Sequence, residues 1–143
     1  MERAAVAAGA IEARPLVDYT EHKTDRAGTG EPEFDRVLGG GLVPGALVLL
    51  GGEPGIGKST LSLQTAMKAS GKVLYVSGEE SPEQVRLRAD RLGILGPELL
   101  ILPETSTEGI VRAVKEHKPD LLFVDSIHTL PPPRVEHAQE PVP

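Results

Sequence analysis

Short apolar runs alternate with amphipathic stretches between residues 46 and 125. The runs are unbroken instead of alternating with polar residues, and they lie within 46–50, 72–77, 99–102 and 120–124. Unbroken runs of this length are typical of parallel strands covered on both faces. The stretch after the first run has apolar residues at helical spacing, namely Leu61, Leu63, Ala66 and Met67. The pattern predicts an α/β fold with a parallel sheet flanked by helices.

Capping signals predict where two of the helices begin and end. Ser81 and Gln84 have the spacing of a capping box, and Gly93 follows at a position that ends the helix. Thr105 and Glu108 repeat the capping-box spacing after the third run. We therefore expect one helix from residue 82 to residue 92 and another that begins after Thr105.

The N-terminal region differs in character from the rest of the chain. Residues 1–27 are predicted to be an extended arm and residues 28–143 the folded part, with 14–33 as a polar surface segment. Glu2, Arg3 and Glu12 interrupt the Ala-rich start, so no signal-peptide core exists there. No stretch reaches the length of a membrane span. We expect a cytoplasmic protein with no membrane partner.

Composition excludes several functional classes. The chain has no Cys, which excludes disulfides, thiolate zinc sites and cysteine nucleophiles. Its formal net charge of −6 provides no overall positive field for nucleic acid, and with 3% aromatic residues few side chains are available for base stacking. Any contact with DNA is therefore expected to be local.

The segment after the first apolar run predicts a phosphate-binding loop. It fits the pattern G-x-x-x-x-G-K-[ST] at every fixed position, and it lies between a predicted strand and a predicted helix. Glycines allow successive backbone N–H groups to converge on an anion, and the positive end of the helix adds attraction. The predicted nucleotide-binding residues are Gly52, Glu53, Pro54, Gly55, Ile56, Gly57, Lys58, Ser59 and Thr60.

Within this loop, two side chains have predicted chemical roles. Lys58 is expected to reach the terminal phosphates of ATP and to act in catalysis, and the Ser59 hydroxyl is expected to bind Mg²⁺. The alternative is a Gly-rich turn that binds nothing. A phosphoanhydride ligand with Mg²⁺ is therefore predicted from the loop, and the family resemblance given below implies that the nucleotide is ATP.

Acidic residues follow the second and fourth apolar runs. Glu79 is our first choice for the carboxylate that activates the attacking water, although Glu79 and Glu80 are also suited to the N-terminus of the next helix. Asp125 ends a Walker B pattern and is predicted to hold Mg²⁺ opposite Ser59. A turn-forming Asp is the alternative for Asp125.

Other charged residues near these motifs have simpler interpretations. Arg86, Arg88 and Arg91 are predicted to lie on a solvated helix face that balances Glu83 and Asp90. His128 follows the Walker B pattern and is interpreted as a loop residue without a role in phosphate sensing or DNA contact.

Four runs of the sequence together resemble a known family. They are FDRVLGGGLVPG at 34–45, GGEPGIGKSTL at 51–61, LYVSGEES at 74–81 and VDSI at 124–127. They closely resemble the RadA or Sms family of bacterial DNA repair ATPases in the RecA superfamily, over about residues 14–129. The resemblance implies a RecA-like P-loop core at 28–143, ATP hydrolysis, branch migration in recombination, a homo-oligomeric ring, and single-stranded or branched DNA and the recombinase RecA as partners.

The chain also departs from the pattern of the family it resembles. The family begins with a four-cysteine zinc ribbon, has Gln where His128 stands, and continues into a KNRFG motif and a Lon-protease-like domain, whereas this sequence ends at Pro143. The family's strand between the phosphate-loop strand and the Walker B strand comes from later sequence. By this resemblance we expect a truncated core, incomplete at its C-terminal end, with a gap in the sheet.

Two other functions fit the same motifs. The first is a nucleotide-binding fragment without turnover, and the second is a KaiC-like signalling ATPase of the same superfamily, which also carries adjacent glutamates after its second strand. ATP hydrolysis by the isolated chain tests the first alternative. Stimulation of hydrolysis by DNA tests the second.

Overall fold

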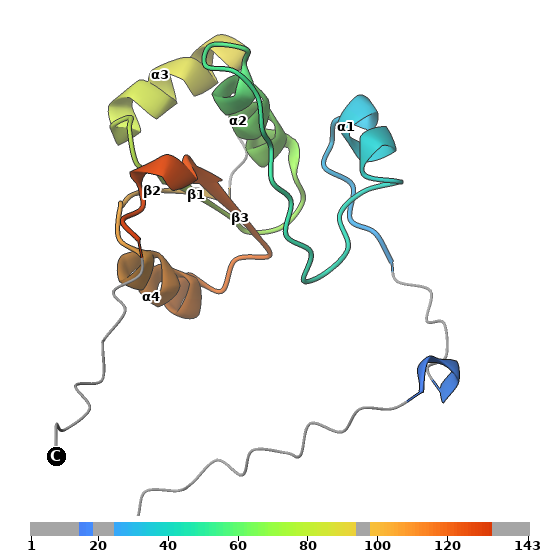
Figure 1. Ribbon diagram of the computed structural model, residues 1–143. Coiled ribbons are helices and arrows are strands. Elements are labelled where there is room, and N and C mark those ends of the chain that lie inside the picture. The colour runs from blue at the N-terminus through green and yellow to red at the C-terminus, as the bar shows by residue number, and fades with distance from the viewer. Residues whose placement is uncertain (1–14, 19–24, 94–97, 133–143) are drawn as a thin grey trace, which may run out of the picture.

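A three-stranded parallel sheet forms the centre of the computed structural model, which describes residues 15–18, 25–93 and 98–132. The strands are β1 (Val73–Ser77), β2 (Leu99–Pro103) and β3 (Leu121–Asp125), in the order β2-β1-β3 (Figure 1). Three of the four predicted strands are thus confirmed. All five residues of β1 are buried, because β1 has a strand on each side and a helix layer on each face.

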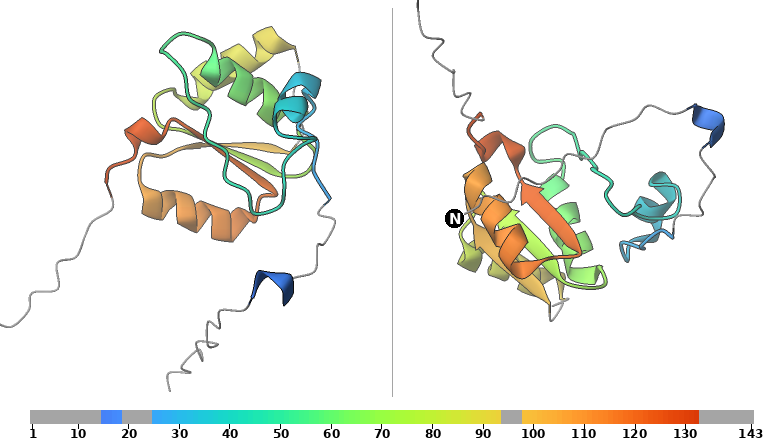
Figure 2. Two further views of the ribbon diagram at one scale, coloured as in Figure 1. Left: turned by 45° about the vertical axis from the view of Figure 1, so that its right-hand side comes forward. Right: turned by 90° about the horizontal axis from the view of Figure 1, so that it is seen from below.

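Helices cover both faces of the sheet. α2 (Lys58–Lys68) and α3 (Pro82–Leu92) lie on one face, and α4 (Thr107–His117) lies on the other (Figures 1 and 2). The first face buries a cluster that includes Leu63, Tyr75 and Val85, and the second a smaller cluster with Leu74 and Ile110. This three-layer arrangement confirms the predicted α/β class with a parallel sheet flanked by helices.

The predicted strand at 46–50 is wrong. These residues form no ladder and lie in the loop between α1 and α2, where Leu47 is 97% exposed and Leu49 is 76% exposed (Figure 1). A strand needs a neighbour for its backbone N–H and C=O groups. Within the described ranges, β3 pairs with β1 alone and no segment pairs with 46–50, so the apolar run has nothing to join.

Both predicted ends of α3 are confirmed, whereas the predicted N-cap of α4 is wrong. Ser81 and Gln84 form the reciprocal bonds of a capping box, and Gly93 ends the helix at φ 74°. The cap of α4 is Ser106 instead of Thr105, because the Ser106 hydroxyl accepts a hydrogen bond from the Gly109 amide at 3.1 Å. The predicted capping box with Glu108 is therefore not the one that forms.

Part of the predicted surface segment at 14–33 packs against the core. Thr29 is fully buried, and Glu31 accepts hydrogen bonds from the side chains of Gln64 and Lys68 on α2. A short helix that the sequence pattern did not indicate, α1 (Pro32–Val37), follows at once. The 3₁₀ helix η1 (Leu16–Asp18) is exposed, in keeping with the prediction, and residues 1–14 lie outside the described residues. The boundary between arm and core at residue 27 stays a prediction.

None of the helices in the described part of the chain combines the length and the apolar character needed to cross a membrane. The longest helices, α2, α3 and α4, have 11 residues each. At 1.5 Å per residue each is about 16 Å long, roughly half the thickness of a bilayer core.

Candidate nucleotide-binding site

The loop that precedes α2 has the backbone geometry that the phosphate-loop pattern requires. Gly55 and Gly57 have φ values of 79° and 105°, in the left-handed region that side chains other than glycine rarely adopt. Gly57 is also the N-cap of α2, so the helix begins at Lys58. Residues 51–57 are exposed. The backbone of the loop and the N-terminus of α2, which carries a partial positive charge, are therefore both accessible to an anion from solvent.

Lys58 folds back over its own loop. Its ammonium donates hydrogen bonds to the carbonyl oxygens of Gly52 and Glu53, the latter at 2.9 Å. A Cβ atom at Gly52 would approach the Ile56 side chain to 3.1 Å, so glycine leaves room for this arrangement. The loop thus holds a cation within reach of any anion that binds there. Ser59 and Thr60 follow in the first turn of α2.

The phosphate loop lies at the same edge of the sheet as the ends of β1 and β3. The chain passes from Lys68 at the end of α2 to Val73 at the start of β1 within five residues, so the helix runs antiparallel to the strand. An 11-residue helix is about 16 Å long and a five-residue strand about 16 Å, so the start of α2 is level with the strand ends. This is the edge at which open α/β sheets bind ligands.

The ends of β1 and β3 are tied to each other. Ser77 and Asp125 are register partners in the parallel ladder, and the Gly78 amide donates to the Asp125 carbonyl at 3.0 Å. Just beyond the two strand ends, the Ser126 hydroxyl donates to a carboxylate oxygen of Glu79 at 3.4 Å. The structure thus brings Glu79 and Asp125, two of the predicted site residues, to adjacent positions.

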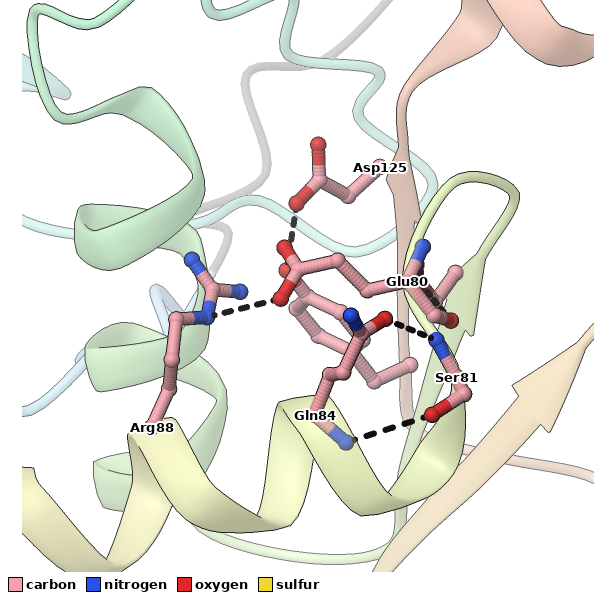
Figure 3. Close-up of polar contacts among 7 residues, drawn as sticks. Glu80, Ser81, Gln84, Arg88 and Asp125 are labelled. Atoms are coloured by element: carbon pink, nitrogen blue, oxygen red, sulfur yellow. Dashed lines mark hydrogen bonds and ion pairs between the residues drawn. The ribbon is translucent and has the colours of Figure 1, made fainter.

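The two adjacent glutamates have different surroundings. Glu79 is exposed, whereas Glu80 is half-buried and forms an ion pair with Arg88 of α3 at 3.2 Å (Figure 3). The Glu80 backbone is also held in place, because the Ser77 hydroxyl donates a hydrogen bond to its carbonyl and accepts one from its amide. Glu79 therefore has the freer carboxylate of the two, and the geometry favours it as the residue that meets water.

Arg88 corrects the prediction that the arginines of α3 form a solvated face. Arg86 does lie on such a face, where it pairs with Asp90 at 2.8 Å, and Arg91 is exposed. Arg88 instead turns inward to Glu80, and its buried Nε and Nη2 atoms form no hydrogen bond within the described part of the chain. His128 lies in η2 (Ile127–Thr129) and is exposed, as predicted for a loop residue.

Tyr75 is a site residue that the sequence reasoning missed. Its hydroxyl donates a hydrogen bond to Oδ2 of Asp125 at 2.7 Å. Burial raises the pKa of Tyr75 well above its ordinary value, and the hydrogen bond to Asp125 adds to this. Strand alternation contained a signal, because Tyr75 shares a face with Ser77, and Ser77 pairs with Asp125.

A close contact positions the loop that carries the glutamates. A Cβ atom at Gly78 would collide with the side chain of Thr129, whose hydroxyl donates to the Ser126 carbonyl at 2.7 Å. The segment after β3 therefore packs directly on the segment after β1. Glycine at position 78 makes this approach possible.

The observed residues fit a magnesium nucleotide. The loop presents glycine backbone, a lysine ammonium and a helix N-terminus, which together suit phosphate oxygens. A hydroxyl at Ser59 and a carboxylate at Asp125 are oxygen ligands of the kind that Mg²⁺ takes alongside phosphate and water.

Comparison with known proteins identifies the class. Residues 27–100 match the family described as "ATPase: KaiC". The chain therefore belongs to the KaiC family of ATPases, and its α/β sheet is the core of a RecA-like P-loop fold.

Relatives of known name narrow the resemblance to the RadA proteins. The chain is 52% identical to DNA repair protein RadA of Bacillus subtilis over 119 residues, which are 81% of this chain and 26% of the relative. It is 48% identical to the protein of the same name from Streptococcus pneumoniae over 126 residues, 87% of this chain and 30% of that one. These identities confirm the resemblance to RadA. The chain spans about a third or less of the length of these relatives.

Proposed function

We propose that the chain binds ATP with Mg²⁺ through residues 52–60 and Asp125 and that it serves as the nucleotide-binding part of a DNA repair ATPase. The observation that carries the proposal is the glycine loop with left-handed backbone at the start of α2, on a sheet whose strand ends place Glu79 beside Ser126 and Asp125 in register with Ser77. Membership of an ATPase family supports the same function.

In this proposal each residue has a defined task. The loop amides and the Lys58 ammonium bind the β- and γ-phosphates and stabilise the charge that develops during transfer. The Ser59 hydroxyl and the Asp125 carboxylate would hold Mg²⁺, which when bound would neutralise phosphate charge. Glu79 orients the attacking water and accepts its proton, because its carboxylate is exposed and bonded only to the Ser126 hydroxyl among the described residues.

The wider role follows from the resemblance to RadA. Because the relatives are named as DNA repair proteins, we propose that hydrolysis depends on single-stranded or branched DNA and assists branch migration in recombination. The corresponding assembly is a homo-oligomeric ring that works with the recombinase RecA in the cytoplasm. The names of the relatives favour this function over a signalling role.

Calorimetry of ATP binding tests the proposal. ATP titrated into the folded chain with Mg²⁺ is expected to give a saturable heat, and the same titration with EDTA a weaker affinity. A folded sample that gives no heat with ATP in either buffer contradicts nucleotide binding. Hydrolysis measured with and without single-stranded DNA then tests the coupling to DNA.

A further inference from the structure

The hydrogen bond between Tyr75 and Asp125 occupies one of the two oxygens of the Walker B carboxylate. The Tyr75 hydroxyl donates to Oδ2 at 2.7 Å, within the range of a well-formed hydrogen bond from a hydroxyl to a carboxylate. Oδ1 forms no bond to another described side chain. The bond therefore distinguishes two otherwise equivalent oxygens and leaves Oδ1 for another ligand.

Tyr75 is held rigidly enough to fix the direction of this bond. It lies in the middle of the central strand, it is 0% exposed, and its ring stacks on Phe123 of β3 with the centroids 6.0 Å apart. A fully buried aromatic side chain packed in this way has little room to change rotamer. The Asp125 carboxylate is thus held by a donor that cannot move away.

The backbone of Asp125 is held at the same time. Its carbonyl accepts the Gly78 amide at 3.0 Å, and β3 is in register with β1 up to this residue. With the main chain fixed by β1 and the side chain fixed by Tyr75, the carboxylate has a single defined orientation. One restraint comes from β1 and the other from Gly78, the residue that follows it.

A second pair of side chains, Glu80 and Arg88, lies next to the bonded Tyr75 and Asp125. Glu80 and Arg88 lie beside Asp125 and form the ion pair at 3.2 Å (Figure 3). The Nε atom of Arg88 faces Glu80, and the buried Nη2 atom forms no hydrogen bond with any residue that the structure describes. Among the described residues, the carboxylate of Asp125 therefore takes its side-chain hydrogen bond from the Tyr75 hydroxyl and forms no ion pair with a basic side chain.

We propose that Tyr75 is a positioning residue for magnesium binding, which orients Asp125 so that Oδ1 faces the metal. The inference rests on the proposed binding of ATP with Mg²⁺. Second-sphere hydrogen bonds orient metal ligands, and their loss typically weakens metal binding about 10- to 100-fold. Removal of the hydroxyl frees the carboxylate to rotate, so the metal must then order the carboxylate itself.

The test compares ATP affinity with and without Mg²⁺ in the full chain. The ratio of the dissociation constant in EDTA to that in Mg²⁺ measures the contribution of the metal. Tyr75→Phe is expected to lower this ratio about tenfold, while the affinity in EDTA stays within about twofold of wild type. A variant that is merely destabilised loses affinity in both buffers and leaves the ratio unchanged.

Two further proteins control the measurement. Thr65→Val removes another buried hydroxyl, one on α2 that has no hydrogen-bond partner, and it is expected to keep the wild-type ratio. Incorporation of p-aminophenylalanine at position 75 restores a donor at the same place, and it is expected to recover most of the ratio. If Tyr75→Phe does not fold, the p-aminophenylalanine variant still decides the question, because rescue of both fold and ratio requires the donor.

The outcomes separate the inference from the function on which it depends. If wild type shows a gain from Mg²⁺ and Tyr75→Phe shows the same gain, the positioning role is wrong and the nucleotide site stands. If wild type binds no ATP, or binds it equally well in both buffers, the proposed function fails and the role of Tyr75 fails with it.

Discussion

At the scale of single residues, the site depends on a few side chains held by neighbours that the motifs do not name. Lys58 bonds to the carbonyls of its own loop, and Asp125 bonds to a tyrosine from another strand. The motif residues carry the charged groups, and the contacts around them fix how those groups are oriented. Substitutions of the motif residues and of their neighbours should therefore have separable effects.

Lys58→Ala is expected to weaken ATP binding about 10- to 100-fold. A hydrogen bond to a charged group contributes about 1.5–3 kcal/mol, and each 1.4 kcal/mol is about a tenfold change in affinity. Calorimetry with Mg²⁺ present measures the effect. Lys115→Ala on the exposed face of α4 is the matched control and should bind as wild type does. Equal affinity in both variants would remove Lys58 from the site.

Glu79→Gln and Glu80→Gln are expected to differ. If Glu79 activates water, Glu79→Gln keeps ATP binding and lowers the rate of hydrolysis about 10²- to 10⁴-fold, the usual contribution of a general base. Glu80→Gln removes the ion pair with Arg88 and should affect stability more than the chemical step. Single-turnover hydrolysis separates the two. A larger loss in Glu80→Gln would reverse the assignment, and no hydrolysis by wild type would favour a binding fragment without turnover.

At the scale of elements, the residue spacing predicted the N-cap of α3 correctly but placed the N-cap of α4 one residue too early. The α3 cap forms where the pattern predicted it, with both bonds of the capping box present. The α4 cap moves one residue along, because Glu104 accepts the amides of Thr105 and Ser106 and so turns the chain before the helix. Two adjacent hydroxyl residues made the position ambiguous in the sequence.

Ser106→Ala and Thr105→Ala form a matched pair for this cap. Ser106→Ala is expected to lower the free energy of unfolding by about 1 kcal/mol, because the Gly109 amide loses its acceptor. Thr105→Ala should change it by less than about 0.5 kcal/mol. Urea denaturation monitored by circular dichroism gives both values. A larger loss for Thr105→Ala would return the cap to the position predicted from sequence.

At the scale of the whole molecule, stability should come from the layers around β1 and not from the apolar run at 46–50. Leu63 is fully buried between α2 and the sheet, whereas Leu47 is almost fully exposed. Burial, and not hydrophobic character, decides what a side chain contributes to folding.

Leu63→Ala is expected to lower the free energy of unfolding by about 2–5 kcal/mol, the usual cost of a large cavity in a core. Leu47→Ser should change it by less than about 0.5 kcal/mol, since the side chain contacts solvent. Denaturant unfolding of the two variants measures both changes. A loss above about 1 kcal/mol in Leu47→Ser would mean that residues 46–50 are packed in solution.

The amino-acid sequence alone determined the local features of this protein. Three strands, three helices, the capping box at Ser81 and the glycine-rich loop before α2 all depend on residues close together in the chain, where periodicity and backbone preference act directly. The family resemblance also came from contiguous runs. These features needed no knowledge of distant contacts.

Only the tertiary structure decided the features that depend on neighbours far apart in the chain. Whether 46–50 forms a strand depends on a pairing partner, and whether Arg88 is solvated depends on where Glu80 lies. The bond between Tyr75 and Asp125 joins residues 50 positions apart. Such contacts are set by strand order and register, which arise when the layers pack; strand alternation gives the face on which a side chain lies but not its partner.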